Sequence, residues 1–159
     1  PHDRTRRQRQ MCIRDSPYCS RCELNIVIPA DFNHIETVHN GAHELLVSKG
    51  WSEEEIGDVT LALDEALTNA IRHGCKNDPS KEVQCLLSFD DAGEVVIVVR
   101  DPGSGFDPAA IPDPTEEANL LKASGRGVLL INQLMDAVEF SDEGRQVSMR
   151  KRRDSSKEN

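Results

Sequence analysis

The sequence is poor in aromatic residues, with four phenylalanines, one tryptophan and one tyrosine among 159 positions. Leucine, valine, isoleucine and alanine must therefore fill the core, and a chain of this length can bury one without disulfide or metal cross-links. No apolar run approaches the roughly 20 residues that span a bilayer, so we expect no membrane segment. The N-terminus is polar and lacks the apolar stretch of a signal peptide, so we expect a cytoplasmic protein.

Basic residues are scarce in the middle of the chain. Residues 23–149 hold eight lysines and arginines against 24 aspartates and glutamates, whereas residues 1–22 and 150–159 each carry a small positive excess. A broad nucleic-acid surface needs clustered cations. The composition therefore argues against direct nucleic-acid binding. It favours protein partners, or a ligand whose charge is met by a metal ion and the backbone.

The cysteines do not form a recognisable metal site. Cys19 and Cys22 make one CxxC pair, but a zinc site needs a second pair at ligand spacing. Unpaired thiols in a reducing compartment are the simpler interpretation, since the chain has an odd number of cysteines. Cys75 and Cys85 are expected to be small buried side chains.

The N-terminal residues have no periodicity. MCIRDS, residues 11–16, resembles the translation of a sequencing-library adapter, so residues 1–16 are interpreted as an assembly artefact. A natural basic arm is the alternative. We expect a disordered basic tail over 1–22, one folded domain over 23–153 and a disordered tail over 154–159.

Hydrophobic periodicity predicts three helices and five strands. A first helix from Ile35 ends at Lys49-Gly50, a cation followed by a C-terminal glycine. A second begins at a capping box formed by Ser52 and Glu55 and ends at Gly74. The remaining elements are predicted as strands at 24–28, 83–89, 95–99, 137–141 and 146–150, and a helix at 128–135.

The order of these elements favours an α+β fold. Turn residues at 90–93 and 142–145 join neighbouring strands as hairpins. The strand at 95–99 is an unbroken apolar run, so both of its faces should be covered. Residues 101–124 contain four prolines and no regular pattern, which is typical of a functional lid or a disordered segment. The prediction is a two-layer sandwich: a mostly antiparallel mixed sheet with helices on one face.

A polar ridge crosses the second helix. In DEALTNAIRHG, residues 64–74, Glu65, Asn69 and His73 recur at four-residue intervals away from the apolar stripe. A solvated face is one interpretation. However, asparagine is a mediocre helix former, and its apolar neighbours indicate a covered helix. Its carbonyl oxygen suits Mg²⁺, and a carboxylate one turn earlier could accept a proton from a nucleophile.

A second segment whose residues could bind a ligand follows the apolar strand. Asp101 stands at the strand end, where its carboxylate can accept hydrogen bonds from an exocyclic amine. Gly103 and Gly105 permit a close backbone approach that side chains would forbid. A tight loop is the alternative interpretation.

A third segment leads into the last predicted helix. Gly125 and Gly127 flank Arg126, and free N–H groups at a helix start favour a phosphate, to which the arginine adds a cation. A plain glycine-rich helix start is the alternative.

In this order, the three segments resemble the Bergerat-type (GHKL, histidine kinase-like) ATPase superfamily. EALTNAIRHG, DPGSGFDP and SGRGVLLINQLMD are most similar to anti-sigma factor serine/threonine kinases, and the resemblance covers about residues 24–152. It implies an ATP- and Mg²⁺-dependent kinase that phosphorylates a STAS anti-anti-sigma protein, sequesters a sigma factor and commonly forms a homodimer. Two alternatives stay open: a non-catalytic ATP-binding regulatory module, and the detached catalytic domain of a histidine kinase.

The resemblance also implies a role for each residue of the site. The expected roles are Glu65 as general base, Asn69 as Mg²⁺ ligand, Asp101 on the adenine amino group, Gly103 and Gly105 in the pocket wall, Gly125, Arg126 and Gly127 around the phosphates, and Lys122 or Arg126 near the terminal phosphate. Residues 107–124 would form the lid. The sequence departs from the family pattern at Gln146-Val147-Ser148, where a threonine near the adenine is common.

Overall fold

A computed structural model of the protein describes residues 22–103 and 123–154, with side chains for 22–103 and 127–154. Almost all of the predicted tails and lid, together with Gly105 and Lys122, lie outside the described residues.

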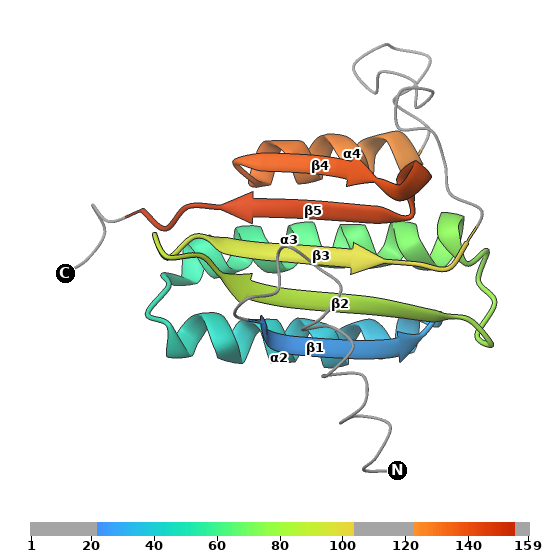
Figure 1. Cartoon of the computed structure of the whole chain (residues 1–159), viewed down its shortest axis with the longest axis horizontal. Coiled ribbons are helices and arrows are strands. Elements are labelled where there is room, and N and C mark those ends of the chain that lie inside the picture. Colours follow the sequence, from blue (N-terminus) through green and yellow to red (C-terminus); the bar gives the residue numbers. More distant parts are fainter. Residues whose placement is uncertain (1–21, 104–122, 155–159) are drawn as a thin grey trace.

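In the described part of the chain, the sheet has five strands in the order β1-β2-β3-β5-β4, and each of the neighbouring pairs is antiparallel (Figure 1). The strands are β1 (Cys22–Pro29), β2 (Glu82–Phe89), β3 (Val95–Arg100), β4 (Ala137–Ser141) and β5 (Gln146–Lys151).

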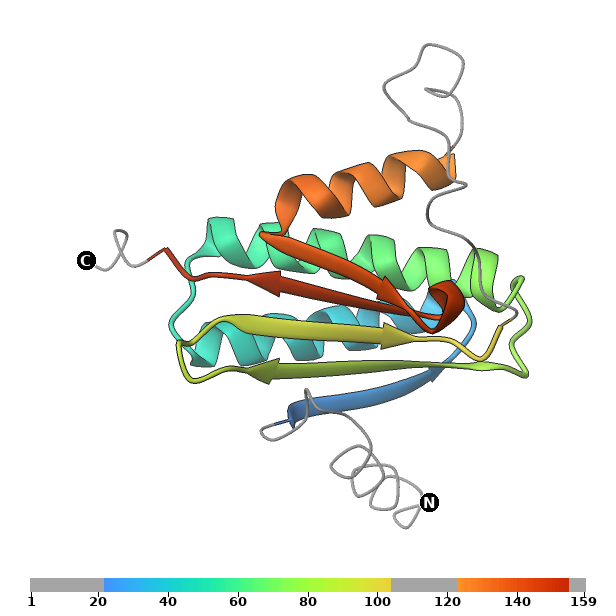
Figure 2. The same ribbon diagram turned by 45° about the horizontal axis from the view of Figure 1, so that its top comes forward.

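The helices α2 (Ile35–Ser48), α3 (Glu53–Asn69) and α4 (Ala123–Leu134) all lie on one face of the sheet (Figure 2). The predicted two-layer α+β sandwich is confirmed. Within the described ranges, each helix is too short or too polar to cross a bilayer.

Two predicted helix signals are confirmed in atomic detail. At the end of α2, the Gly50 N–H donates to the Val47 carbonyl at 3.0 Å and the Trp51 N–H donates to the Leu46 carbonyl at 3.1 Å. Gly50 has a φ of 80°, so this is a Schellman motif, for which glycine is the favoured residue. At the start of α3, the capping box between Ser52 and Glu55 is present in both directions.

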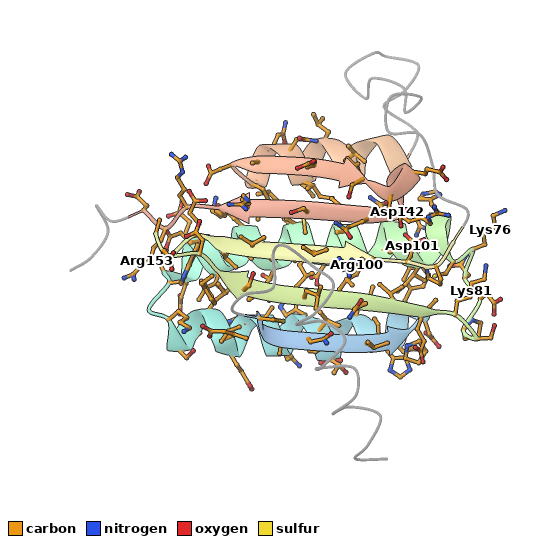
Figure 3. The ribbon with its side chains drawn as sticks, in the orientation of Figure 1. Lys76, Lys81, Arg100, Asp101, Asp142 and Arg153 are labelled. Carbon is orange, nitrogen blue, oxygen red and sulfur yellow. The ribbon has the colours of Figure 1, made fainter. Side chains whose placement is uncertain are left out.

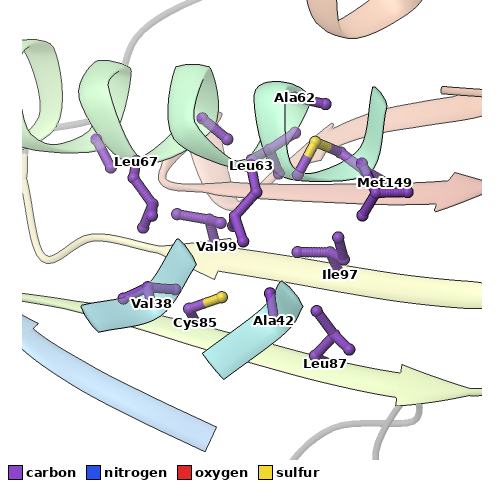
Figure 4. Packing of buried hydrophobic residues seen from close by; sticks show 14 of the residues in the cluster. Val38, Ala42, Ala62, Leu63, Leu67, Cys85, Leu87, Ile97, Val99 and Met149 are labelled. Carbon is purple, nitrogen blue, oxygen red and sulfur yellow. The ribbon is translucent and has the colours of Figure 1, made fainter. Parts of the chain in front are cut away.

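Leucine, valine, isoleucine and alanine form most of the core, as the low aromatic content predicts. Figure 4 shows Leu63 and Leu67 of α3 above Ile97 and Val99 of β3. The apolar strand β3 is covered on both faces, since none of Val95 to Val99 is more than 4% exposed. Val96 and Val98 form a second cluster with Leu86.

The two cysteines predicted to be internal are buried. Cys75 is 0% and Cys85 1% exposed. Burial raises the pKa of the Cys85 thiol to about 12, so this side chain behaves as a small hydrophobic residue.

The end of α3 differs from the prediction of one helix running to Gly74. The α-helical part stops at Asn69, and Ala70–Gly74 form a π-helical turn, η2. Its defining bond joins the Cys75 N–H to the Ala70 carbonyl at 2.8 Å. Periodicity cannot reveal such a turn, because one widened turn hardly alters the apolar pattern. Turns of this kind are frequent at functional sites.

Candidate nucleotide site

The side chains of Glu65 and Asn69 both reach Gly127 on the neighbouring helix α4. Both side chains are half-buried on the side of α3 that faces α4. A Cβ atom on Gly127 would lie 2.9 Å from Glu65 Oε2 and 3.2 Å from Asn69 Nδ2. The two side chains therefore converge on one segment of backbone, an arrangement that a freely solvated helix face would not have.

The start of α4 lies earlier than predicted. The helix begins at Ala123 and not after Gly127, so Gly125, Arg126 and Gly127 belong to its first turns. The prediction treats the glycines as a break, because glycine inside a helix costs about 1 kcal/mol relative to alanine. Tertiary packing overrides that preference here: Gly127 is buried and lets α4 approach α3 closely.

Asp101 lies at the end of β3, where the backbone of two loops holds it. Its N–H donates to the Arg145 carbonyl at 2.9 Å, and its Oδ1 accepts the Gly103 N–H at 2.9 Å. Burial raises the pKa of the Asp101 carboxyl group, an effect that the Gly103 N–H and the charges of Arg145 and Lys81 partly offset. Figure 3 shows Asp101 and Asp142 at one end of the sheet, with Lys76 and Lys81 nearby.

Gly74 and Gly103 permit a close approach between the π-helical turn and Asp101. A Cβ atom on Gly74 would overlap the Asp101 carboxylate, and one on Gly103 would overlap the Gly74 carbonyl group. The two glycines therefore connect the end of the α3 segment to the end of β3. Gly103 is not among the described residues that line the pocket below, so its role in the pocket wall stays a prediction.

One small pocket brings Asn69 and Asp101 together. It lies between α3, β3, α4 and the β4–β5 hairpin, and it is lined by Ala66, Asn69, Ala70, Val99, Asp101, Ile131, Phe140, Gly144, Arg145 and Val147. Its volume of about 20 Å³ holds roughly one water molecule. A purine ring can enter only if some of the lining side chains move.

The β4–β5 hairpin contributes pocket residues that the sequence analysis does not predict. Phe140 and Arg145 line the cavity from segments that follow Asp101 by about 40 positions. Gly144, in the turn before β5, is a sequence feature that could have pointed to these residues. However, a glycine in a hairpin turn is too common to indicate a ligand pocket.

The hairpin residue that faces the pocket from β5 has no hydroxyl group. Val147 lines the cavity and pairs with Val99 on the core face, whereas Ser148 pairs with Val98 on the opposite face. Of the three residues at which the sequence departs from the family pattern, Val147 is the one that lines the pocket.

The remaining predicted residues are placed less fully. His73 is exposed on the π-helical turn and is not among the residues that line the pocket. Partial burial and the nearby Arg72 lower the pKa of its imidazole. Gly125 and Arg126 are located only by their position in α4, and Gly105 and Lys122 lie outside the described residues. The roles of Gly105, Lys122, Gly125 and Arg126 stay predictions, and His73 has no assigned role.

The sequence is similar to curated serine-protein kinases. RsbW of Listeria monocytogenes serovar 1/2a is 30% identical over 137 residues, which are 81% of this chain and 86% of the relative. RsbW of Staphylococcus epidermidis is 29% identical over 135 residues, 79% of this chain and 84% of the relative.

Two solved structures share the fold. The RsbU and RsbW domains of Rv1364c from Mycobacterium tuberculosis match with a TM-score of 0.59 at 22% identity, over 82% of this chain and 32% of that one. The SiaB-SiaC complex from Pseudomonas aeruginosa also gives 0.59, at 17% identity, over 92% and 98%.

A family model also matches the chain, over most of the described residues. The histidine kinase-like ATPase domain covers residues 28–151, which include α3, the pocket and the β4–β5 hairpin. The chain belongs to the family of histidine kinase-like ATPase domains, and within that family it is related to the RsbW serine-protein kinases.

Proposed function

We propose that the protein is an ATP-dependent serine/threonine kinase that phosphorylates a STAS anti-anti-sigma protein and sequesters a sigma factor. The observation that carries the proposal is the convergence of Glu65 and Asn69 on Gly127, beside a pocket that Asn69 shares with Asp101. The relationship to serine-protein kinases of the RsbW type supports the choice of reaction.

The pocket and the neighbouring start of α4 offer contacts for the two ends of a nucleotide. The Asp101 carboxylate can accept a hydrogen bond from the amino group of adenine at the inner end. At the other end, the first N–H groups of α4 have no partner inside the helix, and the helix dipole favours a negative charge there. Because α4 begins at Ala123, these N–H groups lie about one turn before Gly127, and phosphates bound there would be close to the backbone that Glu65 and Asn69 reach.

The oxygen donors near Gly127 fit Mg²⁺. The Asn69 carbonyl and the Glu65 carboxylate are hard oxygen ligands, and Mg²⁺ is usually held in proteins by one or two such groups together with substrate phosphates and water. We assign Asn69 as the residue that holds the ion. When bound, the ion supplies charge neutralisation on the phosphates.

Glu65 is the residue best placed to receive a proton. Phosphoryl transfer depends mainly on positioning and on charge stabilisation, so the protein must present the acceptor hydroxyl group and remove its proton. Glu65 lies one helical turn before Asn69 and faces the same backbone segment. In the proposed reaction, Glu65 accepts the proton of a serine or threonine on the partner protein.

The test is transfer of radiolabelled γ-phosphate from ATP to a STAS protein encoded near this chain. We expect transfer with the wild type and loss of transfer with Glu65→Ala and with Asn69→Ala. Undiminished transfer by Glu65→Ala would remove the proposed base. Co-purification of a sigma factor with this protein tests sequestration. The sigma factor and the homodimer otherwise stay predictions of the resemblance.

The second candidate is a regulatory module that binds ATP without useful transfer. The pocket wall favours it at one point, because Val147 has no hydroxyl group to offer the nucleotide. ATP binding measured together with an absence of transfer to any neighbouring STAS protein would favour this module over the kinase.

A further inference from the structure

We propose that Arg145 contacts the base of the bound nucleotide and supplies the polar group that the pocket wall lacks at Val147. This inference rests on the proposed nucleotide function of the pocket. It adds a polar binding residue from the β4–β5 hairpin, whose other lining residues, Phe140, Gly144 and Val147, are not polar.

Arg145 is tied to the residue that would hold the adenine. It lines the same pocket as Asp101, and its carbonyl oxygen accepts the Asp101 N–H at 2.9 Å. Its positive charge is also near enough to the Asp101 carboxylate to lower the pKa of that group. Asp101 and Arg145 therefore border the same space.

The chemistry of the pocket leaves a role for a hydrogen-bond donor. Among the described side chains that line it, only Asn69, Asp101 and Arg145 are polar. Ionised Asp101 can only accept hydrogen bonds, and Asn69 is assigned to the metal ion. The guanidinium group is a planar donor that can bond to purine ring nitrogens or stack on an aromatic face.

The present partners of the guanidinium group are easily exchanged. Its NH2 atom lies 3.2 Å from Asp142 Oδ1 and 3.3 Å from Glu143 Oε2, and Nε donates to the Asp142 carbonyl at 3.2 Å. The two carboxylate side chains are 66% and 78% exposed. Exposed ion pairs contribute little net stability, so a nucleotide can recruit Arg145 at small cost.

The closing experiment measures the affinity of the full chain for ATP and for ADP, with Mg²⁺, by titration calorimetry. Three variants are compared with the wild type: Arg145→Gln, the double variant Asp142→Asn/Glu143→Gln, and Asp101→Asn as the reference for the base pocket. The double variant keeps Arg145 but removes its two ion pairs. It therefore separates contact with the nucleotide from support of the hairpin.

We expect Arg145→Gln to lower the affinity for ATP and the affinity for ADP by the same factor, roughly tenfold, as the loss of a charge-assisted hydrogen bond predicts. The double variant should bind at least as tightly as the wild type. Equal losses in the double variant and in Arg145→Gln would overturn the inference, as would a loss confined to ATP. If Asp101→Asn lowers nucleotide affinity and Arg145→Gln does not, the role of Arg145 is overturned but the proposed function is not. If the wild type binds neither nucleotide, both are overturned.

Discussion

Gly127 has no side chain, and this allows Glu65 and Asn69 to reach the backbone of α4. The same holds around Asp101, where Gly74 and Gly103 leave the space that the carboxylate and the π-helical turn occupy. At the scale of single residues, the candidate site depends on small residues as much as on charged ones. Substitutions at the glycines therefore test the geometry directly.

Gly127→Ala should separate activity from stability. The added methyl group would displace the ends of the Glu65 and Asn69 side chains, which are flexible, while alanine favours the helix by up to about 1 kcal/mol. We expect an unchanged or slightly higher free energy of unfolding in urea, with phosphate transfer reduced at least tenfold, the order expected for displacing a general base. Gly57→Ala is the matched control, since nothing lies within 4 Å of its added methyl group; full transfer by Gly127→Ala would contradict the geometry.

Asp101→Asn should improve stability while it harms ATP binding. The pKa of Asp101 is raised above its ordinary value of 3.8 by burial, so ionisation costs the folded state stability as the pH rises from 3.8 through the raised pKa. Asparagine does not ionise, so the variant does not lose this stability. The difference in unfolding free energy between the variant and the wild type should grow over that pH interval and stay constant up to neutral pH. ATP affinity should fall by roughly tenfold or more. An advantage that disappears above pH 6, or unchanged ATP affinity, would show that Asp101 has another role.

At the scale of elements, the π-helical turn Ala70–Gly74 links the two halves of the pocket. It follows Asn69 directly and packs against Asp101 through Gly74. The element that carries the proposed metal ligand is therefore coupled to the residue that would hold the base.

Gly74→Ala tests this coupling. Because the new methyl group would overlap the Asp101 carboxylate, we expect a loss of about 1–3 kcal/mol in unfolding free energy together with weaker ATP binding. Gly93→Ala is the control: Gly93 has a φ of 83° in an open turn, so alanine there costs about 1 kcal/mol with no effect on the pocket. If both variants bind ATP like the wild type, the turn does not position Asp101.

The features that could be predicted from the sequence are mostly local. The Ser52–Glu55 capping box and the Lys49-Gly50 helix end depend on residues close together in the chain. The start of α4 depends instead on packing between Gly127 and α3, and periodicity does not contain that information. The pocket wall at Arg145 likewise follows from the pairing of β3 with β5, which brings the hairpin to Asp101.

At the scale of the whole molecule, the sheet and the helices α2, α3 and α4 hold the site through a core that is mainly aliphatic in the described residues. Leu63 and Leu67 attach α3 to the sheet, and both are fully buried. The opposite edge of the same helix carries Glu65 and Asn69. The position of the site residues therefore depends on how firmly α3 is packed.

Leu63→Ala should lower the free energy of unfolding by about 2–5 kcal/mol, the usual cost of a cavity at a buried leucine. Leu61→Ala, two positions earlier on α3, removes a side chain that is 43% exposed and should change stability by no more than about 0.5 kcal/mol. Urea denaturation of both variants provides the comparison. Similar losses in the two would mean that α3 does not pack on the sheet with the face described.

The central claim, that Glu65 acts as the base in phosphoryl transfer, is tested most directly by single-turnover transfer of γ-phosphate to the STAS partner. Glu65→Gln is compared with Asp64→Asn, which alters the adjacent carboxylate, paired with His39 Nδ1 at 2.8 Å on the side of α2. We predict that Glu65→Gln keeps ATP affinity but slows transfer by roughly 100-fold or more, whereas Asp64→Asn transfers at nearly the wild-type rate. Equal rates for Glu65→Gln and the wild type would contradict the account.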